Sequence, residues 1–99
     1  MTHPFSETAD RYVGVVAAWY GWRVIVCKDG IQWIIQRKRG GQRAWRNESF
    51  CVTLRALIRN LTSADAPPDA IETLRTLPEN AAQFDLGAWR EAKADLAIT

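Results

Sequence analysis

The chain has 99 residues, enough for one domain, and it carries a formal net charge of +2 at pH 7. Its apolar fraction of 47%, which includes five tryptophans, is sufficient for one hydrophobic core. The sequence contains no run of about 18 apolar residues, which argues against a membrane-spanning helix. We therefore expect a single domain over residues 1–99 and no membrane partner.

The charge is distributed unevenly along the chain. Residues 20–61 hold nine Lys or Arg against two acids, a net charge of +7, whereas residues 62–99 carry −4. Such asymmetry is typical of a chain whose basic part contacts a polyanion. An acidic tail that folds back and neutralises the basic segment would explain the same pattern, so both interpretations stay open.

Few residues of the chain suit catalysis or metal binding. Cys27 and Cys51 form no CxxC pair, and His3 is the only histidine on which a histidine-based nucleophile or base could depend. No glycine-rich phosphate-binding motif occurs. Because the N-terminus also lacks the pattern of a secretory signal, we expect reduced thiols and a cytoplasmic location. We expect a non-enzymatic protein without metal or cofactor.

The first predicted element is a helix over residues 6–19. Apolar residues recur at helical spacing from Tyr12 to Trp19, and Ser6 or Thr8 is placed to cap the helix.

Residues 20–28 and 31–38 are predicted to form an antiparallel hairpin. Both segments are rich in β-branched and aromatic residues, and the Asp29-Gly30 between them favours a two-residue type I′ turn. That turn sets Val24 opposite Ile35. The face expected to be core then carries Trp22, Val24, Val26, Trp33 and Ile35. The face expected to be exposed carries Arg23, Gln32, Ile34, Gln36 and Lys38.

A third strand over residues 42–47 is predicted after the Gly40-Gly41 turn. A bulged loop there would place Trp45 on the core face, because a one-residue slip reverses the side chains of a strand. Ser49 is then predicted to cap a helix over residues 50–61, whose apolar stripe covers the core face.

The predicted class is α+β with a three-stranded antiparallel sheet. Residues 20–61 form its central ββ-β-α unit. Residues 62–99 form an acidic helical tail, with short helices over 69–77 and 86–96, and Asp85 is placed to cap the second of these.

Basic and polar side chains gather on the expected outer face and at the hairpin tip. Arg and Gln on an exposed strand can hydrogen-bond base edges in a major groove, and the tip from Lys38 to Arg43 is placed to reach phosphates. The candidate nucleic-acid-binding residues are Arg23, Gln32, Gln36, Lys38, Arg39, Arg43 and Arg46. The same face could instead be a solvated surface, or a protein contact built on Ile25 and Ile34.

A pattern of turns and aromatic residues resembles the small three-stranded-sheet-plus-helix DNA-binding domains of phage-type tyrosine recombinases and plant ethylene-response factors. The pattern comprises Trp22-Arg23-Val24-Ile25-Val26, Asp29-Gly30, Trp33, Arg37-Lys38, Gly41, Trp45, Phe50 and Leu54-Arg55-Ala56-Leu57. In that family the exposed sheet face reads DNA, which implies contacts through Arg23, Gln32, Gln36, Lys38 and Arg46.

In size and composition the chain is also similar to small accessory proteins of phages and plasmids. Some of those inhibit host defence nucleases, including CRISPR effectors. The expected partner is therefore nucleic acid, DNA before RNA, with a protein such as a nuclease complex as the alternative.

Overall fold

The computed structural model describes residues 6–98, and it describes side chains for residues 6–92. His3 lies outside the described residues.

Four antiparallel strands form one sheet in the order β1-β2-β3-β4. They are β1 (Val15–Trp19), β2 (Trp22–Val26), β3 (Trp33–Arg37) and β4 (Arg46–Cys51). The remaining elements are helices α1 (Leu54–Ser63), α2 (Pro68–Leu74) and α3 (Leu86–Ile98), with the short 3-10 helix η1 (Ala81–Gln83). The α+β class and the antiparallel sheet are confirmed, but the sheet has four strands instead of three.

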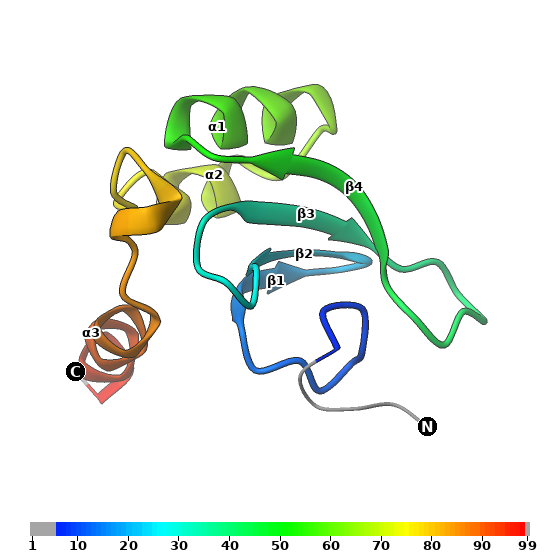
Figure 1. The fold of residues 1–99 in the computed structure, drawn as a ribbon, viewed down its shortest axis with the longest axis horizontal. Helices are drawn as coiled ribbons and strands as arrows, with labels where there is room; N and C mark the ends of the chain where they lie inside the picture. Colours follow the sequence, from blue (N-terminus) through cyan, green and yellow to red (C-terminus); the bar gives the residue numbers. More distant parts are fainter. Residues whose placement is uncertain (1–5, 99) are drawn as a thin grey trace.

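The predicted helix over residues 6–19 is wrong. Its second half is β1, which pairs with β2, and residues 6–14 form turns that cross one face of the sheet (Figure 1). Val15 and Val16 favour a strand because a β-branched side chain loses rotamer freedom in a helix. A two-residue turn then leads from Trp19 into β2, and Gly21 takes the positive φ of 74° that this turn needs.

The predicted register of the β2–β3 hairpin is confirmed. Val24 pairs with Ile35 and Val26 pairs with Trp33. The turn type differs from the prediction, because a type I′ turn needs positive φ at two residues and only Gly30, at 71°, has it. The correct register therefore follows from the matching of apolar side chains as well as from the turn.

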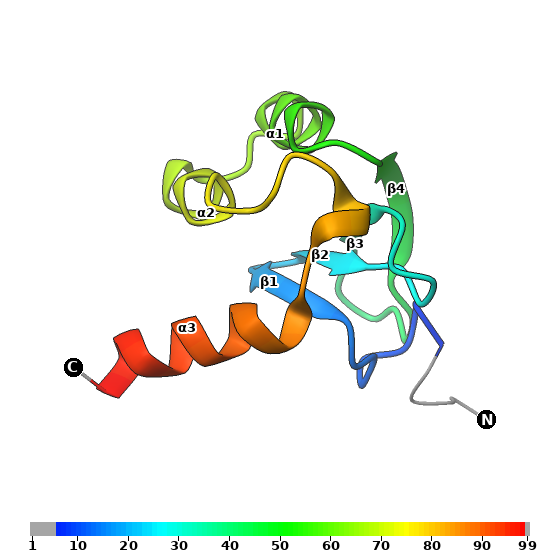
Figure 2. The same cartoon turned by 60° about the vertical axis from the view of Figure 1, so that its left-hand side comes forward.

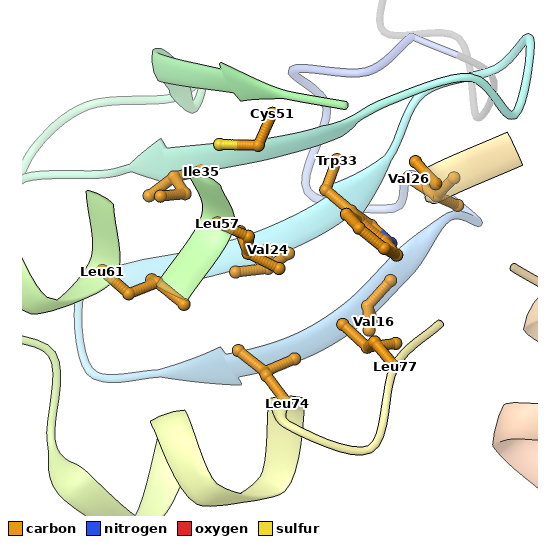
Figure 3. Close-up of a cluster of buried hydrophobic side chains, with 11 residues drawn as sticks. Val16, Val24, Val26, Trp33, Ile35, Cys51, Leu57, Leu61, Leu74 and Leu77 are labelled. Atoms are coloured by element: carbon orange, nitrogen blue, oxygen red, sulfur yellow. The ribbon is translucent and has the colours of Figure 1, made fainter. Parts of the chain in front are cut away.

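The core lies on the predicted face of the sheet. Figure 3 shows Val24, Trp33 and Ile35 pointing from the strands toward Leu57 of α1 and Leu74 of α2. All five of these side chains are buried. The predicted role of the first long helix as a cover for this face is confirmed, and α2 extends that cover over β1.

The boundaries between the third predicted strand and α1 are shifted toward the C-terminus. The strand begins at Arg46 and runs to Cys51, and α1 begins at Leu54. Thr53 caps α1 in place of Ser49, since its hydroxyl accepts a hydrogen bond of 3.1 Å from the Ala56 N–H. Strand pairing with β3 extends through the segment that helical spacing had assigned to α1.

Trp45 is placed on the wrong face by the sequence prediction. It precedes β4 and lies against Arg23, on the face opposite the core. An irregularity in the β3–β4 pairing falls between Ile35 and Gln36, and such a one-residue shift reverses which face a side chain occupies.

The C-terminal helices agree with the prediction in position. Asp85 caps α3 as predicted, with its Oδ1 accepting from the Ala88 N–H at 3.1 Å. Figure 2 shows α3 running beside β1, and the Trp89 indole N–H donates to the Val16 carbonyl at 3.0 Å. No described acid of residues 62–92 forms an ion pair with residues 20–61. The tail thus covers the edge of β1, and no direct contact of this kind neutralises the basic segment.

Replacement of Trp33 tests the assignment of the core. Its side chain is fully buried and packs edge-on against Phe84, with ring centroids 6.1 Å apart. We expect Trp33→Ala to lower the free energy of unfolding by about 3–5 kcal/mol, because it leaves a large cavity. Urea denaturation measures the change, and Tyr20→Ala, whose side chain is exposed, serves as the control with an unchanged midpoint. Equal midpoints for Trp33→Ala and the wild type would mean that this face is not the core.

Candidate nucleic-acid interface

Residues 6–14, called the strap below, cover the sheet face that was expected to be exposed. The strap lies on the side of the sheet opposite α1 (Figure 1). Tyr12 is buried there with Ile25 and Ile34, and its hydroxyl donates to the Val26 carbonyl at 2.6 Å. Ile25 and Ile34 are at most 1% exposed, so the protein contact predicted for them is not available on this surface.

A buried arginine ties the strap to the sheet. Arg23 is only 3% exposed, and its Nη2 donates to the carbonyls of Ala9 at 2.8 Å and Glu7 at 3.1 Å. Its Nε donates to Oε1 of Gln36 at 2.6 Å, and its guanidinium carbon lies 4.5 Å from the centroid of the Trp45 ring. Burial lowers the pKa of Arg23, but a guanidinium stays protonated in proteins. Backbone carbonyls therefore accept hydrogen bonds from a buried cation.

Gln36 completes this network and is fully buried. Its Nε2 donates to the Glu7 carbonyl and to Oδ1 of Asn47, each at 2.8 Å. The expectation that Arg23 and Gln36 lie on an exposed face is thus wrong. The reason is that the strap forms turns instead of a helix, which leaves backbone carbonyls free to accept from these two side chains.

A groove lies at the end of the sheet where two turns meet. The β1–β2 turn and the β3–β4 loop are joined by a hydrogen bond of 2.9 Å from the Lys38 N–H to the Gly21 carbonyl. The groove has a volume of about 510 Å³. Its side-chain lining includes the aromatic residues Tyr20, Trp22 and Trp45 and the cations Arg37, Lys38 and Arg39.

Lys38 is partly neutralised by the strap. Its Nζ lies 2.6 and 2.8 Å from the two carboxylate oxygens of Asp10, and the Trp45 indole N–H donates to the same carboxylate at 2.9 Å. The hydrogen bond from Lys38 is the main reason why the pKa of Asp10 lies below its ordinary value, and the hydrogen bond from Trp45 lowers it further. Lys38 is therefore a poorer phosphate ligand than its position in the sequence predicts.

The three remaining cations of the predicted site are available to solvent. Arg39, Arg43 and Arg46 are exposed, and none of them forms an ion pair with a described residue. Arg39 lines the groove, Arg43 lies beside Asp10 and Arg11 at a smaller hollow of about 270 Å³, and Arg46 pairs with Arg37 across β3 and β4.

Gln32 lies apart from this cluster. It precedes β3, whereas Lys38 follows that strand, so extended chain of about 20 Å separates the two residues. Its half-buried side chain is at the β2–β3 turn. The structure thus brings together Lys38, Arg39, Arg43 and Arg46 and separates Gln32 from them.

The aromatic part of the groove was missed in the sequence. The sequence assigns Trp22 and Trp45 to the core and Tyr20 to the start of a strand. Trp22 does pack against the core, but it also lines the groove. The sequence does contain a pattern that indicates this groove, because aromatic residues flank Gly21 and basic residues lie on both sides of Gly40-Gly41. Antiparallel topology brings the first and third turns of a four-stranded meander to the same end of the sheet, but the missed first strand concealed that relation.

Comparison with protein-family models, with curated proteins and with solved structures finds no match. The resemblance to DNA-binding domains therefore stays a prediction. In the part of the chain that the structure describes, no group of three or more His, Cys, Asp or Glu side chains is placed to hold a metal ion. Across that same part, every helix is too short or too polar to cross a membrane.

A conservative change at Arg23 tests the tie between strap and sheet. Arg23→Lys keeps the charge, but an ammonium cannot satisfy Gln36 and the strap carbonyls from one position. We expect a loss of stability of about 1.5–3 kcal/mol, the range for hydrogen bonds to charged groups. We also expect faster hydrogen exchange at the Trp45 amide, which donates to the Thr8 carbonyl. The control is Arg39→Lys at an exposed site; unchanged stability and exchange in Arg23→Lys would contradict the assigned role.

The Asp10–Lys38 pair gives a prediction for pH dependence. A carboxyl group with a lowered pKa stabilises the fold above its ordinary pKa of 3.8 and loses that effect as pH falls through the lowered pKa. Between about pH 5 and pH 2 the wild type should lose more stability than Asp10→Asn, and the two should converge at the acid end. The difference is small because the Asp10 side chain is 60% exposed. Urea midpoints at stepped pH measure it, with Glu91→Gln as the control; parallel curves for wild type and Asp10→Asn would exclude the effect.

Proposed function

We propose that this chain is a non-enzymatic nucleic-acid-binding protein, with a binding or regulatory role, that contacts phosphates through its β3–β4 loop. The observation that supports the proposal is the set of exposed arginines around that loop. Arg39, Arg43 and Arg46 have no described acidic partner, and Figure 1 shows the loop projecting beyond the sheet.

The chemistry of these side chains suits phosphate. A guanidinium offers planar paired donors that match phosphate oxygens, and it stays charged at every physiological pH. Asp10 is engaged with Lys38, so it leaves the neighbouring arginines to face solvent. α3 lies along β1, and β1 and β4 are the two opposite edges of the sheet. The acidic tail is therefore held at the edge that is farthest from β4 in the strand order.

The mode of contact differs from that implied by the resemblance to sheet-reading DNA-binding domains. Base reading by the sheet face would need Arg23 and Gln36 at the surface, and the strap covers both. The proposal therefore relies on the loop and the adjacent groove. Contacts to phosphate carry affinity without reading sequence, so we expect little base specificity from the loop itself.

A protein partner, as in an inhibitor of a host nuclease, is the second candidate. The observation that favours it is the exposure of Phe50 and Val52, each 56%, at and just after the edge strand β4. An edge strand can accept a strand from a partner, with apolar side chains adding contact. The two candidates differ in their response to salt, since apolar contacts depend on it far less than phosphate contacts do.

Charge reversal at the loop tests the first candidate. In the double variant Arg39→Glu/Arg43→Glu, we expect affinity for duplex and single-stranded oligonucleotides to fall at least tenfold at low salt. The log–log salt slope should flatten by about two units, because each phosphate contact contributes about 0.7–0.9. Fluorescence-anisotropy titrations of DNA and RNA at two salt concentrations measure both quantities.

The matched control is Arg55→Glu/Arg59→Glu on the exposed side of α1, which gives the same net charge. This control should reduce affinity only because it lowers the overall positive electrostatic potential of the protein. Equal losses in the two double variants would reject the loop as the contact site. If the wild type binds no oligonucleotide even at low salt, nucleic-acid binding is excluded and the protein partner becomes the better candidate.

A further inference from the structure

The groove beside the loop offers something that phosphate binding alone does not require, namely an exposed aromatic surface. We infer that the groove selects single-stranded nucleic acid by stacking an unpaired base on Tyr20. This inference rests on the proposed function and specifies the form of nucleic acid that the site takes.

Tyr20 is unusual among the aromatic residues that the structure describes. It follows β1 in a two-residue turn, its side chain is 99% exposed, and it forms no hydrogen bond with another described side chain. Aromatic rings usually bury much of their surface, so a fully exposed ring at the mouth of a groove is free to receive a ligand. Every base has an aromatic face, which makes stacking on such a ring tolerant of sequence.

The other two aromatic side chains of the groove already have partners on their rings. Arg37 places its guanidinium carbon 4.8 Å from the centroid of the Trp22 ring. Trp45 is contacted by Arg23 at 4.5 Å and by Lys38 at 5.9 Å. Tyr20 therefore offers the free ring, while the Arg37–Trp22 pair forms a cationic wall of the same groove.

Phosphate ligands lie next to this stacking position. Arg39 lines the groove together with Tyr20, and Arg43 lies farther along the same loop. A strand whose base stacks on Tyr20 can therefore place its phosphates against the loop arginines. Cationic grooves that carry aromatic stacking residues are a general design of single-strand-binding proteins.

The groove suits an unpaired base better than a base inside a duplex. Its volume of about 510 Å³ falls within the range of about 300–1,000 Å³ for small-molecule sites, which suits a base or a nucleotide. In a duplex each base face is covered by its neighbours, so exposing one costs a few kcal/mol of unstacking and unpairing. An unpaired base meets Tyr20 without that cost.

Three fluorescent probes of equal length test the inference: an oligothymidine, the same backbone with abasic sites in place of the internal thymines, and a duplex. At low salt the wild type should bind the oligothymidine most tightly. Tyr20→Ala should weaken that binding by about 5- to 150-fold, the equivalent of one lost stacking contact, and should leave binding to the abasic strand unchanged.

Two further variants control this measurement. Tyr20→Phe retains the ring and should bind oligothymidine as the wild type does. Ile31→Ala removes an exposed apolar side chain at the opposite end of the sheet and should change nothing. Because Tyr20 is exposed, all variants should keep the urea midpoint of the wild type.

The outcomes distinguish this inference from the proposed function. If the wild type binds all three probes equally, or if Tyr20→Ala binds oligothymidine unchanged, base stacking is overturned and phosphate contact by the loop stands. If the wild type prefers the duplex, the selection for single strands is overturned in the same way. If no probe binds, the inference and the proposed function both fail.

Discussion

Arg23 carries a positive charge between the sheet and the strap, and its donors are taken up by strap carbonyls and by Gln36. A buried cation without such partners costs several kcal/mol, so docking of the strap stabilises the sheet around Arg23. The same contact holds the Trp45 ring beside Arg23 and so brings that indole to the Asp10 carboxylate. One buried side chain thus sets the position of the strap and of one wall of the groove.

The placement of acids decides where the positive charge of the chain is accessible. Asp10 takes up Lys38, the one cation of the loop that lies half-buried, and leaves the exposed arginines with solvent as their partner. The tail carries its acids to the edge of β1, where Trp89 donates to the Val16 carbonyl. These two arrangements keep a strongly basic surface at the opposite side of the sheet, next to the exposed ring of Tyr20.

Local patterns were sufficient for the elements whose partners are close in sequence. The register of the hairpin, the core face with Trp33, and the Asp85 cap follow from spacing and turn residues. The strap and its ties were not predictable in this way, because Tyr12 to Trp19 show a spacing that suits a helix equally well. Among the site residues, the exposed loop arginines were predicted, whereas the burial of Gln36 depends on a carbonyl 29 residues away. The face of Trp45 depends on a one-residue irregularity in β3–β4 pairing that no local signal marks.

The strap also has a consequence for the order of events during synthesis. It is translated before the surfaces that hold it, which come from β2, β3 and Trp45. At about 5–20 residues per second, translation needs roughly 2–7 s to proceed from Thr8 to its partner Trp45. The strap therefore lacks its partners until Trp45 has been made, and a pause in translation before Asn47 would lengthen that interval.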